Sequence, residues 1–247
     1  MSMQGTIIVT GASRGIGAAI AIALAEQGFN VACLSRKGEL PAVPDASDAA
    51  KARCTAFACD VTKGDSLRNA FEQAAQKGPI IGLVNNAGVH LEGPSATFSV
   101  EDFDTVFSTN STSVFMACQQ IYPHLVAAGG GLIVNIGSFF DKMGVKRNLA
   151  YCASKAAVGA MTRCLAVEWA GKGIRVIDVA PGYIMTDLNK EAMAAGPLRE
   201  YLDKRIPGRQ PGTSADVAKL VKALYAADIP FLSGETIYID GAQGIAH

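Results

Sequence analysis

The sequence carries no surplus of charge and no long apolar run. Its 247 residues include 22 basic and 22 acidic side chains, so the formal net charge at pH 7 is zero. This balance argues against a protein that binds nucleic acid or a membrane surface through bulk charge. No apolar run approaches the roughly 18 residues of a membrane span, and no basic, apolar leader precedes the first apolar segment. We therefore expect a cytoplasmic protein with neither a nucleic-acid nor a membrane partner.

The cysteine spacings of metal sites are absent as well. None of the six cysteines forms a C-x-x-C pair or lies at ligand spacing from a histidine. Most of them fall in apolar segments, which favours buried, reduced thiols over disulfides and predicts no metal site. These cysteines are Cys33, Cys54, Cys59, Cys118, Cys152 and Cys164.

Short apolar runs alternate with helical stretches along the chain. Hydrophobic residues make up 49% of the sequence and charged residues only 18%, which is enough apolar surface for a three-layer core. Short continuous apolar runs are expected for strands of a parallel sheet that is covered on both faces. The alternation predicts an α/β protein with a single domain over residues 1–247, a Rossmann fold whose doubly wound parallel sheet has helices on both faces. The seven expected strands are residues 5–10, 30–35, 54–59, 80–84, 131–136, 174–180 and 235–239, and the expected helices are about 15–27, 64–77, 99–128, 151–171 and 213–227.

One crossover departs from this pattern. Residues 38–48 contain Pro41 and Pro44, and two prolines so close together disfavour a helix interior. We expect a shortened or irregular connection there.

A glycine-rich turn follows the first expected strand. Gly11, Gly15 and Gly17 lie between the apolar run at residues 5–10 and an alanine-rich stretch at residues 18–27 with high helix propensity. Strand, glycine turn and helix in this order form the context of a phosphate-binding loop. The glycines let the backbone approach a pyrophosphate, and the helix N-terminus supplies free N–H groups. We expect this loop to bind a dinucleotide through Gly11, Ser13, Arg14, Gly15, Ile16 and Gly17.

A tyrosine, a lysine and a serine suggest proton transfer. Tyr151 and Lys155 are four residues apart in an expected helix, so their side chains lie on one face. A phenol with its ordinary pKa of about 10 is a poor acid or base near neutrality. A cation one turn away stabilises the phenolate, and a hydroxyl such as that of Ser138 completes a site for moving a proton to or from a carbonyl oxygen. The alternative is that a Tyr-x-x-x-Lys pair arises by chance.

Taken together, these motifs resemble those of the classical short-chain dehydrogenase/reductases. The resemblance covers nearly the whole chain and is closest to the branch that reduces 3-oxoacyl groups on acyl carrier protein. It implies transfer of a hydride between a nicotinamide cofactor and a ketone or secondary alcohol, and assembly as a homotetramer through the helices at 99–128 and 151–171 and the C-terminal segment. The matching segments, in family order, are Thr10–Gly17, Asn85–Gly88, Ser138, Tyr151, Lys155 and Pro181–Gly182.

The resemblance also implies a role for each catalytic residue. Tyr151 protonates the developing alkoxide, and Ser138 donates a hydrogen bond to the same oxygen. Lys155 lowers the pKa of Tyr151 and binds the nicotinamide ribose, while Asn110 holds a water in a proton relay to Lys155.

Further cofactor contacts are implied at the ends of other strands. Asp60 and Val61 receive the adenine, although Asp60 has an alternative role as the N-cap of the next helix. The remaining positions, for the ribose and the nicotinamide carboxamide, are Asn86, Ala87, Gly88, Pro181, Gly182, Ile184 and Thr186.

The charges after the second strand favour NADP(H) over NAD(H). Folds that select NAD place an acid there for the ribose 2′-hydroxyl, but residues 34–37 contain none. Arg36 and Arg14 suit a 2′-phosphate through charge-assisted hydrogen bonds. NAD(H) stays possible, because Arg36 and Lys37 are also compatible with a solvated loop end.

The substrate is less well defined by the sequence. Phe139, Phe140 and Tyr183 flank Ser138 and Tyr151 and suggest an apolar substrate pocket. Residues 187–209, which are interrupted by glycine and proline, are expected to form a mobile lid.

A reductase of acyl carrier protein needs cations at the mouth of its site. Residues 127–131 have none, although Lys142, Lys146 and Arg147 are expected by the entrance and Lys172 near the end of the helix at 151–171. The resemblance still favours a 3-oxoacyl thioester of acyl carrier protein or coenzyme A as the substrate, and a free small-molecule ketone, sugar or polyol is the alternative. A catalytically idle nucleotide sensor is a more remote alternative.

Overall fold

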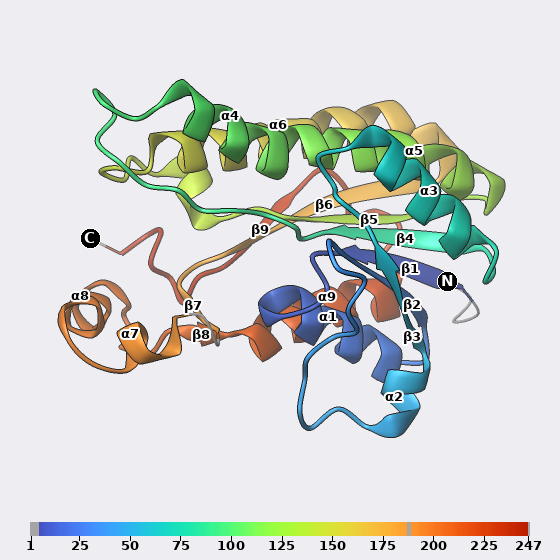
Figure 1. Ribbon diagram of the computed structural model, residues 1–247, viewed down its shortest axis with the longest axis horizontal. Helices are drawn as coiled ribbons and strands as arrows, with labels where there is room; N and C mark the ends of the chain where they lie inside the picture. Colours follow the sequence, from blue (N-terminus) through green and yellow to red (C-terminus); the bar gives the residue numbers. More distant parts are fainter. Residues whose placement is uncertain (1–4, 187–188, 247) are drawn as a thin grey trace.

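A seven-stranded parallel sheet forms the middle layer of the molecule (Figure 1). The computed structural model describes residues 5–186 and 189–246. Strand order is β3-β2-β1-β4-β5-β6-β9, with every neighbouring pair parallel. The predicted doubly wound sheet is thus confirmed. Its strands are β1 (Thr6–Thr10), β2 (Asn30–Ser35), β3 (Cys54–Ala58), β4 (Ile80–Asn85), β5 (Gly131–Ile136), β6 (Ile174–Pro181) and β9 (Thr236–Ile239).

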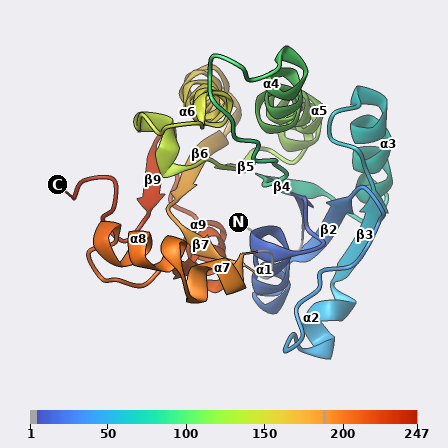
Figure 2. The same ribbon diagram turned by 60° about the vertical axis from the view of Figure 1, so that its left-hand side comes forward.

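Helices cover both faces of this sheet (Figure 2). One face carries α1 (Gly15–Glu26), α2 (Asp48–Ala52) and α9 (Ser214–Ala227), and the other carries α3 (Gly64–Ala75), α4 (Val100–Phe107), α5 (Ser113–Ala127) and α6 (Leu149–Trp169). Strand side chains alternate between the two layers. On β6, Ile177 and Val179 pack in the α1 and α9 layer, while Ile174 and Val176 pack in the α3, α5 and α6 layer.

The crossover from β2 to β3 is short and irregular, as its two prolines predict. Only α2 interrupts it, with the Ser47 hydroxyl accepting from the Ala50 N–H at the helix start.

The expected single helix over residues 99–128 is instead interrupted. A π-helical segment, η1 (Ser108–Thr112), separates α4 from α5. The physical reason is a tertiary contact, because Asn110 at its centre hydrogen-bonds the segment that follows β4 rather than solvent. A π turn inserted in an α-helix is a frequent feature of functional sites.

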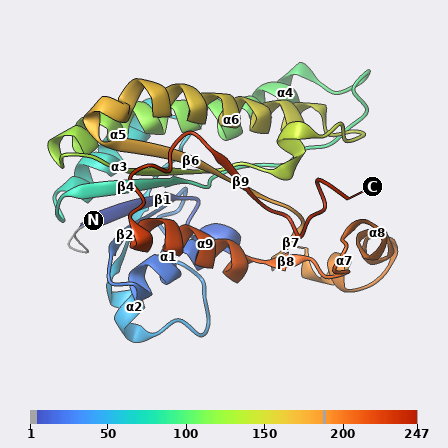
Figure 3. The ribbon, with the colours of Figure 1, turned by 180° about the vertical axis from the view of Figure 1, so that it is seen from behind.

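The segment after β6 projects from one end of the molecule (Figure 3). It contains β7 (Ile184–Met185), α7 (Lys190–Ala194), α8 (Pro197–Arg205) and β8 (Gly212–Thr213), with β7 and β8 paired. Met193, Leu202 and Ile206 form a small apolar cluster of their own there. The predicted lid coincides with this segment, except that residues 187 and 188 lie outside the described residues. Its mobility stays a prediction.

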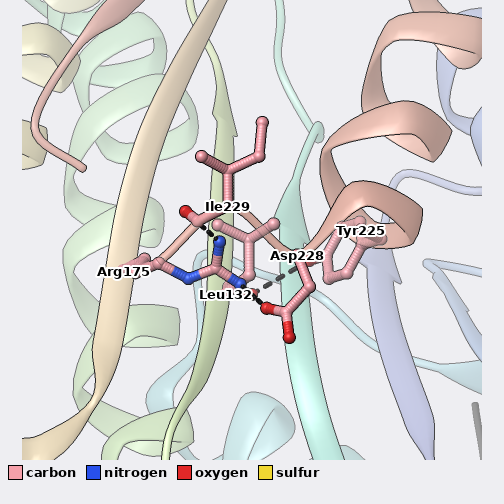
Figure 4. A network of polar contacts seen from close by, with 5 residues as sticks. All are labelled: Leu132, Arg175, Tyr225, Asp228 and Ile229. Carbon is pink, nitrogen blue, oxygen red and sulfur yellow. Dashed lines mark hydrogen bonds and ion pairs between the residues drawn. The ribbon is translucent and has the colours of Figure 1, made fainter. Parts of the chain in front are cut away.

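Buried polar contacts tie α9 and the segment after it to the sheet (Figure 4). The Tyr225 hydroxyl lies 3.0 Å from the carbonyl oxygens of both Leu83 and Leu132. Arg175 pairs with Asp228 at 2.8 Å and donates to the Ile229 carbonyl at 2.7 Å. These contacts satisfy polar groups that would otherwise be buried without partners.

Among the described residues, no helix is both long and apolar enough to cross a membrane. All six cysteines are free thiols, four of them buried, while Cys152 is partly exposed and Cys164 exposed.

Candidate functional site

A cavity of about 1140 Å³ opens at the carboxyl ends of the strands, where the strand order reverses between β1 and β4. Ligands of doubly wound folds bind at this position. Of the residues predicted for the site, all but Asn110 line the cavity. Those lining residues are Gly11, Ser13, Arg14, Gly15, Ile16, Gly17, Arg36, Asp60, Val61, Asn86, Ala87, Gly88, Ser138, Phe139, Phe140, Tyr151, Lys155, Pro181, Gly182, Tyr183, Ile184 and Thr186.

The glycine loop packs too tightly for side chains. Gly11 has a φ of +65°, in the left-handed region that favours glycine. A Cβ on Gly17 would lie 2.3 Å from the Gly11 carbonyl oxygen, so α1 starts directly against the turn. No side chain caps the first N–H groups of α1, and no acid lies in its first turn. These N–H groups remain available to an anion such as a pyrophosphate.

Asn86 joins this loop to the end of β4. Its amide nitrogen donates to the carbonyls of Thr10 and Gly11 at 3.0 and 3.2 Å. The Thr10 hydroxyl in turn accepts from the backbone N–H groups of Asn86 and Ala87. The two strand ends that bound the crevice are therefore held in one fixed arrangement.

Arg14, Arg36 and Asp60 line the part of the cavity that lies at the ends of β1, β2 and β3. Both arginines are exposed, and neither is in an ion pair with a described residue. The Asp60 carboxylate accepts from the N–H and hydroxyl of Thr62, which together with the charges of Lys63 and Arg36 lowers the pKa of Asp60. The alternative that Asp60 caps the next helix is wrong, because the N-cap of α3 is Lys63.

Tyr151 and Lys155 face the same cavity from successive turns of α6. The Lys155 Nζ lies 5.8 Å from the centre of the Tyr151 ring and donates to the Ile136 carbonyl at 2.7 Å. Ser138 follows the end of β5, where its hydroxyl accepts from the Phe140 N–H at the start of the short turn η2 (Phe139–Lys142). Tyr151 and Lys155 thus lie on one face of α6 and line the same cavity as the glycine loop, as the sequence predicted.

The protonation of these groups differs from the expectation. Burial raises the pKa of Tyr151, and a hydrogen bond with Ser138 acts in the opposite direction. The Lys155 charge is not among the causes of this pKa shift. Burial lowers the pKa of Lys155 to about 8, against an opposing effect of Asp178. Tyr151 is therefore a neutral phenol near pH 7, able to donate a proton.

Asp178 on β6 is a buried acid that the sequence reasoning missed. It is fully buried, and its Oδ1 has no hydrogen-bond partner among the described residues. Thr236 on β9 donates to Oδ2 at 3.3 Å. Burial raises the pKa of Asp178 to about 6, while the Lys155 charge lowers it and Asp141 raises it. The available signal was a carboxylate in the middle of the strand β6, between Ile177 and Val179.

Asn110 lies behind the cavity wall rather than in it. Its amide nitrogen donates to the Val89 carbonyl at 2.9 Å and the Ser154 hydroxyl at 3.1 Å, and its oxygen accepts from the Val89 N–H at 2.8 Å. Both amide N–H groups are thus already used by the protein. Ser111 adds a bond to the Ser154 carbonyl, so η1 is joined to α6 one residue before Lys155. The water relay expected at Asn110 stays a prediction.

His90 and Asn148 also line the cavity and were missed. The His90 Nε2 is hydrogen-bonded to the Asn148 Oδ1. The His90 ring lies 4.7 Å from that of Tyr151, centre to centre, with an edge contact. His90 is one of only three histidines in the chain, and its place two residues after Gly88 was an available signal. Among the described residues, no cluster of histidine, cysteine or acid suits a metal ion.

The chain is similar to known proteins over nearly its whole length. Residues 5–196 match the family model described as short chain dehydrogenase. The 3-oxoacyl-[acyl-carrier-protein] reductase of Staphylococcus epidermidis is 33% identical over 98% of this chain and 99% of its own length. The D-threitol dehydrogenase of Mycolicibacterium smegmatis is 34% identical over 96% of this chain and 92% of its own length.

A solved structure is similar over its whole length. It is described as a putative 2-deoxy-D-gluconate 3-dehydrogenase from Agrobacterium tumefaciens with bound NADP. The TM-score is 0.85 at 32% identity, covering 97% of this chain and 96% of the other.

Proposed function

The chain belongs to the short-chain dehydrogenase family and is an oxidoreductase that acts on CH–OH groups with NAD(P), and we propose that it reduces a ketone with NADPH. The observation that carries this proposal is the content of one cavity. That cavity joins the uncapped start of α1 and two unpaired arginines to Ser138, Tyr151 and Lys155.

The residues at the crevice fit a dinucleotide phosphate. The first N–H groups of α1 would hold the pyrophosphate, and Arg14 and Arg36 would hold a 2′-phosphate by charge-assisted hydrogen bonds. Asp60 and Val61 would border the adenine, and Lys155 would bind the nicotinamide ribose. The nicotinamide supplies the hydride, with its two electrons, to the carbonyl carbon.

The protein supplies the proton and the orientation. Tyr151 gives its proton to the carbonyl oxygen as the C=O π bond breaks, so that the products are an alcohol and a tyrosinate that is reprotonated from solvent. Ser138 donates a hydrogen bond to the same oxygen. Lys155, cationic below about pH 8, stabilises the tyrosinate that forms.

A free ketone suits the substrate side better than a protein-bound thioester. Phe139, Phe140 and Tyr183 line the space next to Tyr151. The turn from residue 127 to 131, where a reductase of acyl carrier protein would benefit from a cation, has none.

A 3-oxoacyl thioester is the second candidate. Its support is the 33% identity to the Staphylococcus epidermidis reductase and the exposed cation of Lys146 beside the cavity. Rates of NADPH consumption with acetoacetyl thioesters and with a panel of free ketones separate the two. A protein that consumes NADPH with none of them is a nucleotide sensor and contradicts the proposal.

Cofactor preference is tested at Arg36. We expect Arg36→Gln to raise the KM for NADPH about tenfold through loss of a charge-assisted bond while leaving the KM for NADH within about twofold. Lys37→Gln, a neighbouring exposed cation that does not line the cavity, is the matched control. Equal changes for both coenzymes would rule out a phosphate role for Arg36.

Three further expectations stay predictions. The first is assembly as a homotetramer. Val100 on α4, Phe115 on α5 and Val167 on α6 are exposed and offer apolar surface for contacts between subunits. Closure of residues 187–209 over the substrate and a place in the cytoplasm are the other two.

A further inference from the structure

A second cavity, of about 390 Å³, adjoins the first beside Tyr151. Phe139, Phe140, Val145 and Tyr183 line both cavities. We call the second one the side chamber. Its volume lies within the range of small-molecule sites. The remaining lining residues come from the loop after η2, from α8 and from the C-terminal segment, and they are Met143, Gly144, Lys146, Tyr201, Arg205 and Gln243.

Aromatic rings lead from Tyr151 into the side chamber. The Phe140 ring lies 6.0 Å from those of Tyr151 and Tyr183, and the Tyr183 ring lies 5.4 Å from Phe139 and 6.2 Å from Tyr201. All four contacts are edge-to-face. Such a wall favours a flat or compact ring over a thin flexible chain, because ring faces and edges offer the larger contact area.

Gln243 brings an unused amide to the side chamber. Its residue is only 6% exposed, and its buried Oε1 has no hydrogen-bond partner among the described residues. No described group pairs with its amide nitrogen either. A buried amide oxygen without a partner is unfavourable. Because the amide nitrogen makes no bond within the described residues, it can donate to a polar group of a ligand in the cavity that Gln243 lines.

The charges around the side chamber have one sign. Lys146 and Arg205 line it, and no aspartate or glutamate does. Neither cation is in an ion pair with a described residue. The Arg205 guanidinium is close enough to Tyr183 to act on its hydroxyl, because it opposes the burial that raises the pKa of Tyr183. An anionic group of a ligand would therefore meet favourable potential there.

From these three observations we infer that the side chamber binds the body of the substrate, and that this substrate is a cyclic ketone bearing a carboxylate. The inference rests on the proposed reduction at Tyr151. The ring lies among Phe139, Phe140 and Tyr183, the carboxylate faces Arg205 and Lys146, and the Gln243 amide nitrogen donates a hydrogen bond to that carboxylate.

The test compares ring keto acids with their methyl esters, which have the same ring and carbonyl without the charge. Suitable pairs are 3-oxocyclohexanecarboxylate and 4-oxocyclohexanecarboxylate with their methyl esters. We expect wild-type protein to favour the acids about tenfold in kcat/KM at low salt, the range of an exposed charge-assisted contact, with the preference shrinking as salt is added. Arg205→Gln should reduce that preference to about twofold, by lowering kcat/KM for the acids more than for the esters.

Lys204→Gln is the matched control, since Lys204 is the neighbouring exposed cation on α8 but does not line the side chamber. It should retain the full preference. Gln243→Leu should raise the KM for the acids about fivefold with kcat unchanged, without lowering the melting temperature of the ligand-free protein. A merely structural glutamine would instead lower it.

The outcomes separate this inference from the proposed function. The inference would be overturned if esters and simple ketones were reduced as fast as the acids, or if Arg205→Gln and Lys204→Gln had equal effects. Either result would leave the proposed ketone reduction standing. No NADPH consumption with any ketone would overturn both.

Discussion

Burial, more than a neighbouring charge, sets the protonation of Tyr151. The spacing of Tyr151 and Lys155 indicated a cation that lowers the pKa of the phenol, yet burial raises it. A phenol that stays protonated is suited to the direction in which a carbonyl oxygen receives a proton. The lysine is itself buried, with its pKa lowered to about 8, so its charge is the one that titrates within the working range of the enzyme.

The charge of Asp178 acts on that of Lys155. Charged and polar groups near Asp178 include Lys155 on α6, Asp141, Thr236 and Tyr238. Its carboxylate raises the pKa of Lys155, so Asp178→Asn should lower that pKa further. We predict that the alkaline loss of ketone reduction moves to lower pH by roughly one unit, measured as the pH dependence of kcat.

The same variant has a stability signature with a definite sign. The pKa of Asp178 is raised to about 6, so its contribution to stability is fully present below the unfolded pKa and lost as pH rises through 6. Asp178→Asn should therefore unfold at higher temperature than wild type near pH 7, with the difference vanishing near pH 4. Asp216→Asn, at the exposed capping box of α9, should leave the kinetic pH profile unchanged. An unchanged profile in Asp178→Asn would show that the acid does not act on Lys155.

At the scale of elements, the π segment η1 joins the helix that carries Tyr151 and Lys155 to the loop after β4. Asn110 and Ser111 contact Ser154, the residue before Lys155, and Asn110 also pairs with both backbone groups of Val89. The loop after β4, the middle of the α4 to α5 region and α6 are thus joined at one point. Because Ser154 directly precedes Lys155, this contact holds the backbone from which the Lys155 side chain extends into the cavity.

Asn110→Ala should lower the free energy of unfolding by about 1–3 kcal/mol, because it leaves buried backbone and hydroxyl groups without partners. Urea unfolding measures this change. Ser108→Ala, on a half-buried residue of the same segment whose hydroxyl donates only to the nearby Thr105 carbonyl, should change it by less than about 0.5 kcal/mol. Equal effects of the two substitutions would mean that Asn110 does not join the elements as described.

The sequence predicted most elements because their signals are local. Apolar runs located the seven strands, and Pro41 and Pro44 indicated the irregular crossover before α2. The interruption at η1 could not be predicted from the sequence, because this π turn is stabilised by contacts to Val89 and Ser154, which are distant along the chain. The small β7 and β8 pair is two residues per strand, too short for any periodicity.

At the scale of the whole molecule, topology explains why separate motifs converge. Parallel strands in the order β3-β2-β1-β4-β5-β6-β9 place the ends of β1 and β4 side by side, so the glycine loop meets Asn86. The end of β5 brings Ser138 to the same edge, opposite Tyr151 on α6. Motif order along the chain was enough to predict this site. His90, Asp178 and the side chamber required three-dimensional packing, because their meaning depends on what lies against them.

The central claim is that Tyr151 delivers the proton beside a bound dinucleotide, and Tyr151→Phe tests it most directly. Phenylalanine keeps the ring that contacts His90 and Phe140 and removes only the hydroxyl. With a ketone that the wild type reduces, single-turnover consumption of NADPH should slow by about 10²–10⁴, while the Kd for NADPH stays within about twofold. A near-normal rate with tight NADPH binding would contradict the account.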